Sequence, residues 1–527
     1  MSPLALAVPA LAQQSGQVST PAIQYGALSP ILVVFGAALL GVVLEAALTP
    51  PARRVVQPVV ALAGLVAALV AVIVLHDRRE LLAARAVAID GPALFMQGTI
   101  LVLAVAAVLL VAERRVDPGG GSIVADAAVV PGAAGARAQL ASSATQTEAY
   151  PLMSFAVAGM MLFAAANNLL VMFVALEILS LPLYLLAGLA RRRRLLSQEA
   201  AVKYFLLGAF SSAFFLYGLA MIYGYAGSVD LGRIADAVSG VGRNDTYLYL
   251  GLGLLGVGLF FKIGAAPFHS WTPDVYQGAP TPVTAFMAAG TKVAAFGALL
   301  RVLYVPFGGL RWDWRPIVWA VAIVTMIVGA VVAITQRDVK RMLAYSAIAH
   351  AGFLLTGVAA ANRDGLSGSM FYLVTYGFTT IAAFAVVTLV RTGAGEASDL
   401  SQWQGLGRRS PLLAGVFAFL LLALAGIPLT SGFTGKFAVF AAAVAGNATP
   451  LVVIALVSSA VAAFFYVRVI VLMFFQEPAA DGPFVVTGSV LTYAAVGLGA
   501  AVTLVLGVAP QPLLDLANSA ATSGFLR

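Results

Sequence analysis

The chain has 527 residues, of which 61% are hydrophobic and only 10% charged, and its formal net charge is +8. A soluble domain carries about 25% charged residues, so a soluble fold of this length is excluded. The apolar runs span about twenty residues or more, which indicates helices in lipid rather than the short alternations of a membrane barrel. The basic excess is typical of cytoplasmic loops, so no nucleic-acid partner is expected.

The sequence contains no cysteine and three histidines. Disulfides, thiolate metal sites and cysteine-ligated iron–sulfur clusters are therefore excluded within this chain, and three histidines are too few for a convincing metal site. Two glycine patterns, at 251–256 and 432–436, have some likeness to nucleotide-binding loops. Both lie inside predicted apolar spans, so neither indicates a bound nucleotide.

In chain order, the sequence begins with MSPLALAVPALAQQ. This stretch resembles a signal peptide but lacks a basic start, so we expect residues 1–27 to remain as an N-terminal segment. Three spans are predicted within residues 28–113. A cytoplasmic loop is predicted at 114–149, where the run Pro118-Gly119-Gly120-Gly121 and many Ala and Ser residues favour flexible backbone.

Residues 150–304 and 316–475 each contain five predicted spans, and residues 486–508 form the last one. The predicted fold class is therefore an all-α polytopic membrane protein with about fourteen transmembrane helices. The predicted spans are 28–48, 57–76, 93–113, 150–166, 168–190, 201–226, 246–278, 281–304, 316–336, 341–360, 368–391, 411–445, 450–475 and 486–508.

The loops predicted on one side of the membrane hold fifteen basic residues, and those on the other side hold ten. The larger set includes the run Arg191 to Arg194. Because cytoplasmic loops carry the excess of Arg and Lys, this side is predicted to be cytoplasmic. Both termini are then expected outside the cytoplasm.

Two predicted spans, 246–278 and 411–445, are longer than thirty residues, whereas about twenty suffice to cross a bilayer. Each contains glycine and proline, which interrupt a helix. They are the seventh and twelfth spans, and this odd offset reverses their direction in the membrane. We therefore interpret helices 4–8 and 9–13 as inverted repeats, each with a broken helix at an ion site, and two unrelated kinks are the alternative. The residues interpreted as helix breaks are Gly264, Pro267, Pro428, Gly432 and Gly435.

Lysine is rare in this chain, since only five of the thirty basic residues are Lys. Four of the five lie within predicted spans, while the loops use Arg almost throughout. Arg keeps its proton in proteins, whereas a buried Lys amine can become neutral. This pattern indicates sites that gain and lose protons. The five residues are Lys203, Lys262, Lys292, Lys340 and Lys436.

Glu177 is the only acid in the middle of a predicted span. A charge at a helix centre costs about 2.5–3.5 kcal/mol, so we expect it to be paired, with Lys262 as its partner. Pairing would favour the charged amine and separation would let burial neutralise it, which outlines a proton switch. A purely structural ion pair is the alternative. Lys292 and Lys436 are further relay candidates, with static contacts as the alternative.

Three other residues are possible members of the relay. His350 lies between the two broken helices in sequence and has a suitable side chain, although a packing role is the alternative. His269 follows the first break and is expected near the entrance. Lys203 lies near the cytoplasmic end of its span, where it could instead snorkel to the interface.

The stretch from Lys262 to Phe296, KIGAAPFHSWTPDVYQGAPTPVTAFMAAGTKVAAF, resembles the antiporter-like membrane subunits of proton-pumping NADH:quinone oxidoreductase, respiratory complex I. Supporting stretches are LEILSLPLYLL around Glu177, QRDVKRMLAYSAIAHAGF from Gln336 and GIPLTSGFTGKF around Lys436. Within that family, VYQGAPTPVTAF favours the subunit N group over its two sister subunits.

The resemblance covers roughly residues 28–508 and implies a role for each buried charge. Glu177 would pair with Lys262 and modulate its proton affinity. Lys292 would be the central relay, with His350 nearby. Lys436 would pass the proton toward the outside.

The resemblance also implies that the chain is a subunit of a translocase and has no redox centre of its own. FMN, iron–sulfur clusters and quinone would be bound by partner subunits, and quinone reduction there would drive proton translocation. The implied surroundings are the bacterial plasma (inner) membrane, crossed several times, with the other membrane and peripheral subunits of complex I as partners.

Two other functions remain open from the sequence. The chain could belong to a multi-subunit cation/proton antiporter, and co-purification with a quinone-reducing complex would separate that function from the first. It could also be a non-pumping structural subunit, in which case Lys292→Ala would leave pumping unchanged in an intact assembly.

Overall fold

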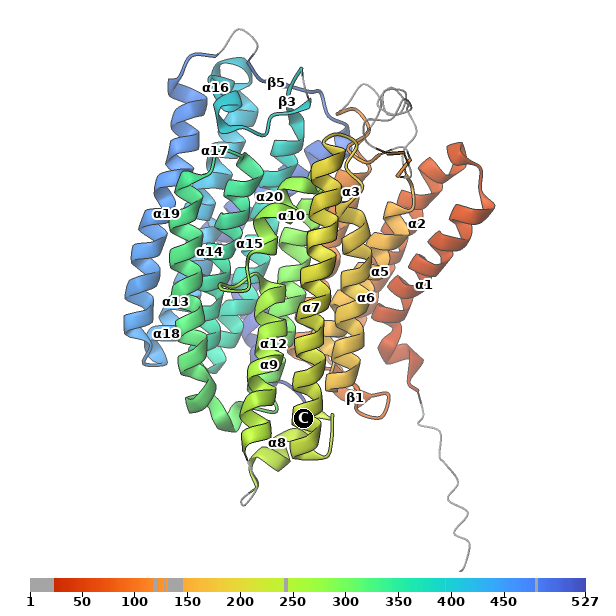
Figure 1. The fold of residues 1–527 in the computed structure, drawn as a ribbon, viewed down its shortest axis with the longest axis vertical. Coiled ribbons are helices and arrows are strands. Elements are labelled where there is room, and N and C mark those ends of the chain that lie inside the picture. The colour runs from red at the N-terminus through yellow and green to blue at the C-terminus, as the bar shows by residue number, and fades with distance from the viewer. Residues whose placement is uncertain are drawn as a thin grey trace, which may run out of the picture.

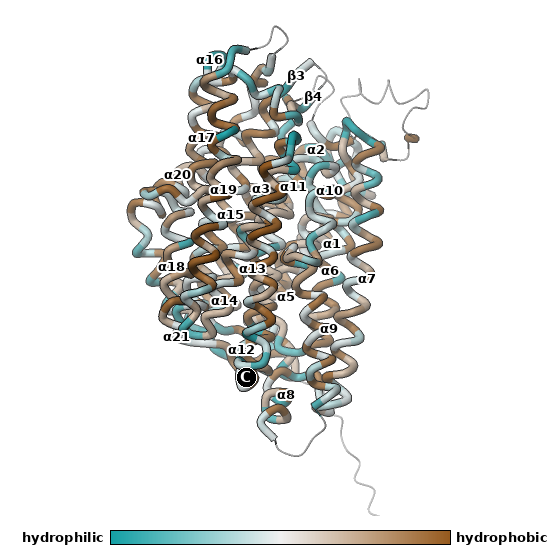
Figure 2. Tube along the Cα trace, turned by 60° about the vertical axis from the view of Figure 1, so that its left-hand side comes forward, coloured by the Kyte–Doolittle hydropathy of each residue, from teal (hydrophilic) through white to brown (hydrophobic). Residues whose placement is uncertain are grey.

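Long helices run side by side between two ends of the molecule in the computed structural model (Figure 1). Hydrophobic residues fill these helices, and hydrophilic residues gather in the loops at the ends (Figure 2). The protein is therefore a membrane-spanning helix bundle, as predicted. Much of the predicted segment 1–27 and of the predicted loop 114–149 lies outside the described residues. The structure describes residues 23–116, 121–124, 126–127, 129–130, 146–240, 245–393, 395–478 and 482–527.

Within the described residues, twelve helices are long and apolar enough to cross a bilayer. Three shorter helices, α5, α17 and α18, are also apolar. Counting α5 as one crossing and α17 with α18 as another gives the fourteen predicted from the sequence. The helices of the first half are α1 (Tyr25–Ala47), α2 (Pro50–Val74), α3 (Gly91–Val111), α5 (Ala149–Ala165), α6 (Leu169–Ala187), α7 (Arg194–Ala226), α8 (Leu231–Val238), α9 (Thr246–Ile263), α10 (Trp271–Gly278), α11 (Thr281–Phe286) and α12 (Lys292–Tyr304), the last two joined by a π-helical turn at Met287–Thr291.

The second half continues the bundle and ends in a helix that the sequence analysis did not predict. Its helices are α13 (Arg311–Thr335), α14 (Val339–Ala359), α15 (Arg363–Leu389), α16 (Leu406–Arg409), α17 (Pro411–Ala425), α18 (Ser431–Ala445), α19 (Thr449–Phe475), α20 (Val490–Val508) and α21 (Gln511–Ser523), with 3-10 turns at Gly308–Leu310 and Leu400–Trp403. α21 is too short to span and instead packs against α3 and α15.

Two small antiparallel sheets lie outside the spans. One is a hairpin between α2 and α3, and the other joins the loop after α15 to the segment before α20 in the order β4-β3-β5. The strands are β1 (Glu80–Leu82), β2 (Val87–Ile89), β3 (Val390–Thr392), β4 (Gly395–Glu396) and β5 (Phe484–Val485).

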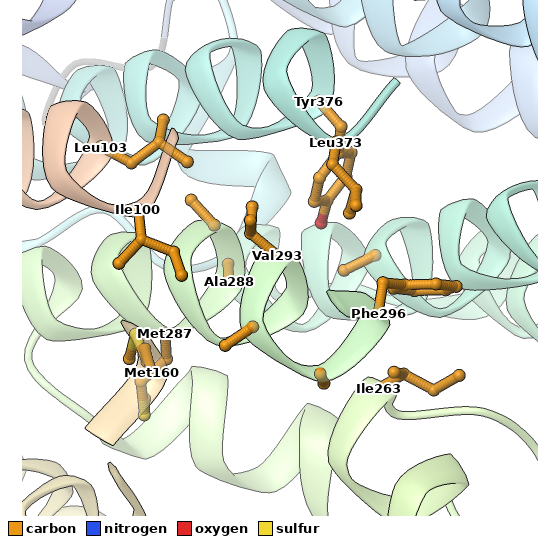
Figure 3. Packing of buried hydrophobic residues seen from close by; sticks show 14 of the residues in the cluster. Ile100, Leu103, Met160, Ile263, Met287, Ala288, Val293, Phe296, Leu373 and Tyr376 are labelled. Carbon is orange, nitrogen blue, oxygen red and sulfur yellow. The ribbon is translucent and has the colours of Figure 1, made fainter. Parts of the chain in front are cut away.

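The centre of the bundle consists of three spans that other helices surround. Over their most apolar windows, Thr281–Tyr304 and Arg363–Leu389 are fully buried and Val339–Ala359 is 94% buried. Figure 3 shows this packing, with Val293 of α12 close to other buried apolar side chains. Lys292, Arg301 and Lys340, which lie on these spans and are buried, are therefore held away from lipid, as buried charges require.

The first predicted break is confirmed. α9 ends at Gly264, which has a φ of +74°, and the chain resumes as α10 only at Trp271. α9 lies in the lower half of the bundle and α10 in the upper half (Figure 1). A neighbouring side chain accepts from a backbone N–H that the break leaves without a helical partner, because the Ala266 N–H donates to Thr325 Oγ1 at 2.9 Å. Pro267 lies within this break, as predicted.

The second predicted break is confirmed, but two of its residues were assigned wrongly. α17 ends at Gly426, with a φ of +90°, and Pro428 lies in the gap before α18. Gly432 and Gly435 are inside α18 and serve close packing instead. A Cβ on Gly432 would lie 1.8 Å from the Ala423 carbonyl oxygen, so only glycine lets the two half-helices approach this closely.

Candidate functional site

Lys262 lies in the last turn of α9, just before the first break, and is 4% exposed. Its Nζ donates to Ser180 Oγ at 2.7 Å and to the Tyr204 hydroxyl at 3.5 Å. The Tyr204 ring stacks on Trp271, whose Nε1 donates to the Phe261 carbonyl at 2.9 Å. The amine is thus held by hydroxyls and aromatic faces that are themselves anchored to the broken helix.

Glu177 does not form the direct ion pair with Lys262 that the sequence predicted. Ser180, one turn further along α6, receives the Lys262 amine instead. The Glu177 Oε1 atom is buried and has no hydrogen-bond partner in the structure. The carboxylate still interacts electrostatically with Lys262. The structure therefore shows a separated arrangement of the two charges, in which the amine is bonded by a neutral hydroxyl.

Lys292 begins α12 and is also 4% exposed. Its Nζ donates to the Ile263 carbonyl at 3.1 Å and to the Ala347 carbonyl of α14 at 2.9 Å. The amine lies 5.6 Å from the centre of the Tyr376 ring. The Ile263 carbonyl is available because α9 ends there, at Gly264, so the helix break itself supplies an acceptor for this lysine.

His350 lies on α14, one turn after Ala347, and is 2% exposed. Its Nδ1 is 2.7 Å from the Tyr372 hydroxyl, and its Nε2 is 3.4 Å from the Tyr466 hydroxyl. Tyr466 is also hydrogen-bonded to Ser346. Both ring nitrogens therefore face phenols, each of which can donate or accept a proton.

Lys436 lies on α18 and is 5% exposed. Its Nζ donates to the Leu424 carbonyl at 3.1 Å, to the Ala425 carbonyl at 2.8 Å and to Ser459 Oγ at 2.8 Å. The amine lies 4.8 Å from the centre of the Phe353 ring. The two carbonyls belong to the last residues of α17, where the second break leaves them without helical partners.

Lys292 and Lys436 thus share one arrangement. Each amine donates to the end of the first half of a broken helix, to one carbonyl from Lys292 and to two from Lys436, and an aromatic ring lies beside it. Carbonyl dipoles and ring faces stabilise a protonated amine, and a neutral amine can still donate hydrogen bonds to the same groups. Both protonation states are therefore compatible with this geometry.

The relay candidates form a series in the bundle that hydrogen bonds connect only in part. His350 and Lys436 both contact Phe353, whose ring centre is 5.7 Å from that of the imidazole and 4.8 Å from the Lys436 amine. The Leu424 carbonyl accepts a hydrogen bond from Lys436 and also interacts with His350. In order, the groups are Ser180, Lys262, the Ile263 carbonyl, Lys292, the Ala347 carbonyl, His350, Phe353 and Lys436. Hydrogen bonds join Lys262 to Ser180 and Lys292 to both carbonyls, and the contacts of Phe353 are ring contacts.

Two predicted candidates lie outside this series. Lys203 pairs with Glu199 at 2.6 Å and with Asp274 at 2.8 Å, and its side chain is 42% exposed. Asp274 also bonds Arg341 at 2.6 Å, so Lys203 belongs to an ion-pair network that ties α7, α10 and α14 together. His269 lies in the first break, and its Nδ1 is buried without a hydrogen-bond partner.

Sequence reasoning missed the hydroxyl groups that hold the relay residues. These groups come from apolar helices, where Ser and Tyr also occur for other reasons. One signal was present, because Tyr372 and Tyr376 are spaced by four residues and therefore share a face of α15. The missed residues are Ser180, Tyr204, Ser346, Tyr372, Tyr376, Ser459 and Tyr466. Within the described residues, no group of three or more His, Asp or Glu side chains could hold a metal ion.

The chain has extensive similarity to known proteins. The family described as NADH:quinone oxidoreductase/Mrp antiporter matches residues 166–492. NADH-quinone oxidoreductase subunit N of Parafrankia sp. (strain EAN1pec) is 76% identical over 525 residues, which cover 99% of this chain and 100% of the relative. The subunit N of Rhodococcus opacus (strain B4) is 60% identical and covers 96% of this chain and 98% of the relative.

Solved structures agree with these sequence matches. A chain in the respiratory complex I of Thermus thermophilus with bound aureothin is 35% identical, with a TM-score of 0.75 over 93% of this chain and 99% of that chain. A chain in the Mrp complex of Dietzia sp. DQ12-45-1b superposes with a TM-score of 0.78 over 95% of this chain and 97% of that chain, but at 22% identity this likeness shows the fold alone.

Proposed function

The chain belongs to the NADH:quinone oxidoreductase/Mrp antiporter family, and from this premise we propose that it is the antiporter-like subunit N of respiratory complex I. Its work is to translocate protons across the bacterial inner membrane as one subunit of this translocase. Identity of 76% over nearly the whole length to a subunit N supports this assignment. A role in a cation/proton antiporter has weaker support, because the likeness to the Mrp chain is one of fold.

One observation supports proton translocation most directly. Three lysine amines and one imidazole, each at most 5% exposed, lie inside the bundle, and the amines of Lys292 and Lys436 donate to carbonyls that the two helix breaks leave open. A free charge is costly inside the bilayer, and a proton moves only between groups within hydrogen-bond reach or bridged by water, so translocation needs buried groups that can exchange a proton. Lysine and histidine can make such exchanges, whereas arginine cannot.

In the proposed direction, the proton passes from the cytoplasm to Lys262, then to Lys292, His350 and Lys436, and finally to the exterior. Glu177 sets the proton affinity of Lys262 by approaching or leaving its amine. The separated arrangement, with Ser180 bonded to Lys262, is the state that favours proton release. Tyr372 and Tyr466 orient His350 for exchange.

The same proposal covers the surroundings of the chain. The end of the bundle that carries Arg191 to Arg194, called the arginine-rich face below, is cytoplasmic, and both termini lie outside. Residues 150–304 and 316–475 are inverted repeats. The other membrane and peripheral subunits bind FMN, iron–sulfur clusters and quinone, and this chain binds none of them.

The test replaces the central lysine by a permanent cation. Lys292→Arg keeps the charge, but a guanidinium cannot release its proton. Loss of a proton-transfer group typically lowers the rate of that transfer by about 100-fold or more, so the share of pumping that passes through this subunit is expected to be lost. Purified complex in sealed vesicles gives the two readouts, which are NADH:quinone turnover and acidification per NADH oxidised.

Arg468→Gln is the matched control. It removes a charge from a spanning helix, where Arg468 donates to the Ile334 carbonyl at 2.8 Å, outside the series. This variant is expected to retain the wild-type ratio of protons to NADH. A fully assembled Lys292→Arg complex that pumps at the wild-type ratio would contradict the proposal.

A further inference from the structure

The amines of Lys262 and Lys292 share no hydrogen-bond partner within the described residues. Lys262 donates to Ser180 and to the Tyr204 hydroxyl, whereas Lys292 donates only to backbone carbonyls, one of them that of Ile263. A carbonyl accepts hydrogen bonds but holds no proton that it could pass on. The step between the two lysines therefore needs a further group that both accepts and donates a proton.

Tyr276 is a buried phenol on α10, the second half of the first broken helix, and it is 2% exposed. Side chains on a helix tilt toward its N-terminus, so this ring leans back toward the break. The ring centre is 6.3 Å from that of Trp271 and 6.1 Å from that of Phe384 on α15, and both contacts are edge-to-face. The phenol is thus held between the break and a central span of the bundle.

Tyr276 connects the surroundings of the two lysines. Its phenol interacts electrostatically with the phenols of Tyr376 and Tyr204. The Tyr204 hydroxyl lies 3.5 Å from the Lys262 amine, and the Tyr376 ring centre lies 5.6 Å from the Lys292 amine. Tyr204, Tyr276 and Tyr376, called the phenol row below, come from α7, α10 and α15 and extend from one lysine to the other.

The Tyr376 hydroxyl has a feature that packing does not explain. It is buried and makes no hydrogen bond, and the same holds for Thr380 Oγ1, one turn further along α15. The two hydroxyls are close enough to interact, so they face a common space. In Figure 3 the Tyr376 hydroxyl points from α15 toward the helix that carries Val293. A buried hydroxyl without a partner lowers stability, and phenylalanine would fill the same place without this cost, so the hydroxyl is better explained by water or proton binding.

We propose that the phenol row carries the proton from Lys262 to Lys292, with water bridging neighbouring hydroxyls. Each oxygen, of phenol or of water, accepts a proton on a lone pair and releases the proton that it held to the next oxygen. Only N–H and O–H bonds break and form. The net change is that the Lys262 ammonium becomes an amine and the Lys292 amine becomes an ammonium. The row supplies the carrier for one step of the proposed relay, so its role rests on the proposed function.

Tyr376→Phe is the sharpest test, because it keeps the ring and removes only the unbonded hydroxyl. Loss of a positioned proton-transfer group lowers the transfer rate by about 100-fold, so the ratio of protons to NADH in sealed vesicles is expected to fall to that of Lys292→Arg. Thermal release of the subunit from purified complex is expected at or above the wild-type midpoint, since no hydrogen bond is lost. A structural role of the hydroxyl would instead lower this midpoint and leave the ratio unchanged.

Tyr276→Phe tests the middle of the row, and it keeps the ring contacts with Trp271 and Phe384. Its ratio of protons to NADH is expected to fall to the same level. Combined with Lys292→Arg, it is expected to cause no further fall, because both substitutions block the same step. Tyr376→Phe alone decides the case if Tyr276→Phe does not assemble.

The matched control is Tyr304→Phe, which removes a hydroxyl from the span that carries Lys292. This hydroxyl donates to the Val358 carbonyl at 3.2 Å, outside the phenol row. The variant is expected to pump at the wild-type ratio.

Three outcomes would overturn the phenol row as the carrier. The first is a wild-type ratio in assembled Tyr376→Phe or Tyr276→Phe. The second is an equal loss in Tyr304→Phe, which would indicate a general effect of removing a hydroxyl. The third is a further fall when Tyr276→Phe is added to Lys292→Arg, which would place the phenol in another step. A failure of the proposed function differs from all three, because it would appear as wild-type pumping by Lys292→Arg.

Discussion

Asp90 and Arg301 form a fully buried ion pair at the end of the bundle opposite the arginine-rich face, and its removal should destabilise the protein strongly. The two side chains are both 0% exposed and lie 2.8 Å apart. Asp90 also accepts hydrogen bonds from the Ala93 N–H at 2.9 Å and the Leu526 N–H at 3.0 Å. The Phe525 ring covers the guanidinium at 4.8 Å, so the end of the chain closes this site.

Removing one partner of a buried pair typically costs about 3–5 kcal/mol, because the other charge is left without compensation. Asp90→Ala should therefore shift the folded-to-unfolded ratio by more than about 100-fold. Asp90→Asn with Arg301→Gln should recover part of this loss, since it leaves two neutral groups that can still bond. The assay is thermal release of this subunit from purified complex, followed on native gels at fixed detergent concentration.

The control is Asp515→Asn on α21, where an exposed carboxylate accepts a bond from Gln511 at 2.7 Å. Exposed pairs of this kind contribute less than about 1 kcal/mol, so its release midpoint should match that of the wild type. If Asp90→Ala had the same release midpoint as Asp515→Asn, the buried pair would not stabilise the protein as proposed. If the double variant were no more stable than Asp90→Ala, the uncompensated charge would not be the cause.

Two further predictions concern stability. Burial alone would raise the pKa of Glu113, but bonds from Thr492, from the Arg115 N–H and from Ser489 outweigh it and hold this pKa below the ordinary value of 4.5. Because the pKa is depressed, the ionised carboxylate stabilises the fold above pH 4.5. Glu113→Gln should therefore lower the free energy of unfolding by about 1.5–3 kcal/mol at neutral pH, and this difference from the wild type should shrink as the pH falls below 4.5. A difference that does not change with pH would refute this cause. Gly432→Ala places a Cβ against the Ala423 backbone and should cost about 1–3 kcal/mol, whereas Gly415→Ala meets no atom within 4 Å and should be neutral or slightly stabilising in the same thermal assay. Equal stability of the two alanine variants would contradict the packing role of Gly432.

The spans could be predicted well because hydropathy is a local property. The first break was predicted correctly from Gly264 and Pro267, which interrupt a helix by their own backbone chemistry. At the second break, Gly432 and Gly435 also looked like interruptions. Their role in the structure depends on the residues packed against them. Gly435, for example, makes room for the Tyr372 ring, because a Cβ at this position would lie 2.6 Å from that ring. Sequence alone does not distinguish a glycine that ends a helix from one that admits a neighbour.

The helix α21 was not predicted for a related reason. It has 13 residues, too few to span a bilayer, and its place is set by packing on α3 and α15. Phe525 and Leu526, which follow it, reach the buried ion pair of Asp90 and Arg301. These contacts join residues more than two hundred positions apart, beyond the reach of any local pattern.

The amino-acid sequence by itself determined that this chain spans a membrane, where two of its helices are interrupted, and which ionisable side chains lie within the spans, since composition and backbone chemistry act locally. The partners of those side chains were decided only by tertiary structure. Lys262 bonds Ser180, 82 positions away, rather than Glu177, and Lys292 bonds a carbonyl of α14, 55 positions away. Hydrogen bonds depend on distances of about 3 Å, and only the packing of the helices against one another sets them.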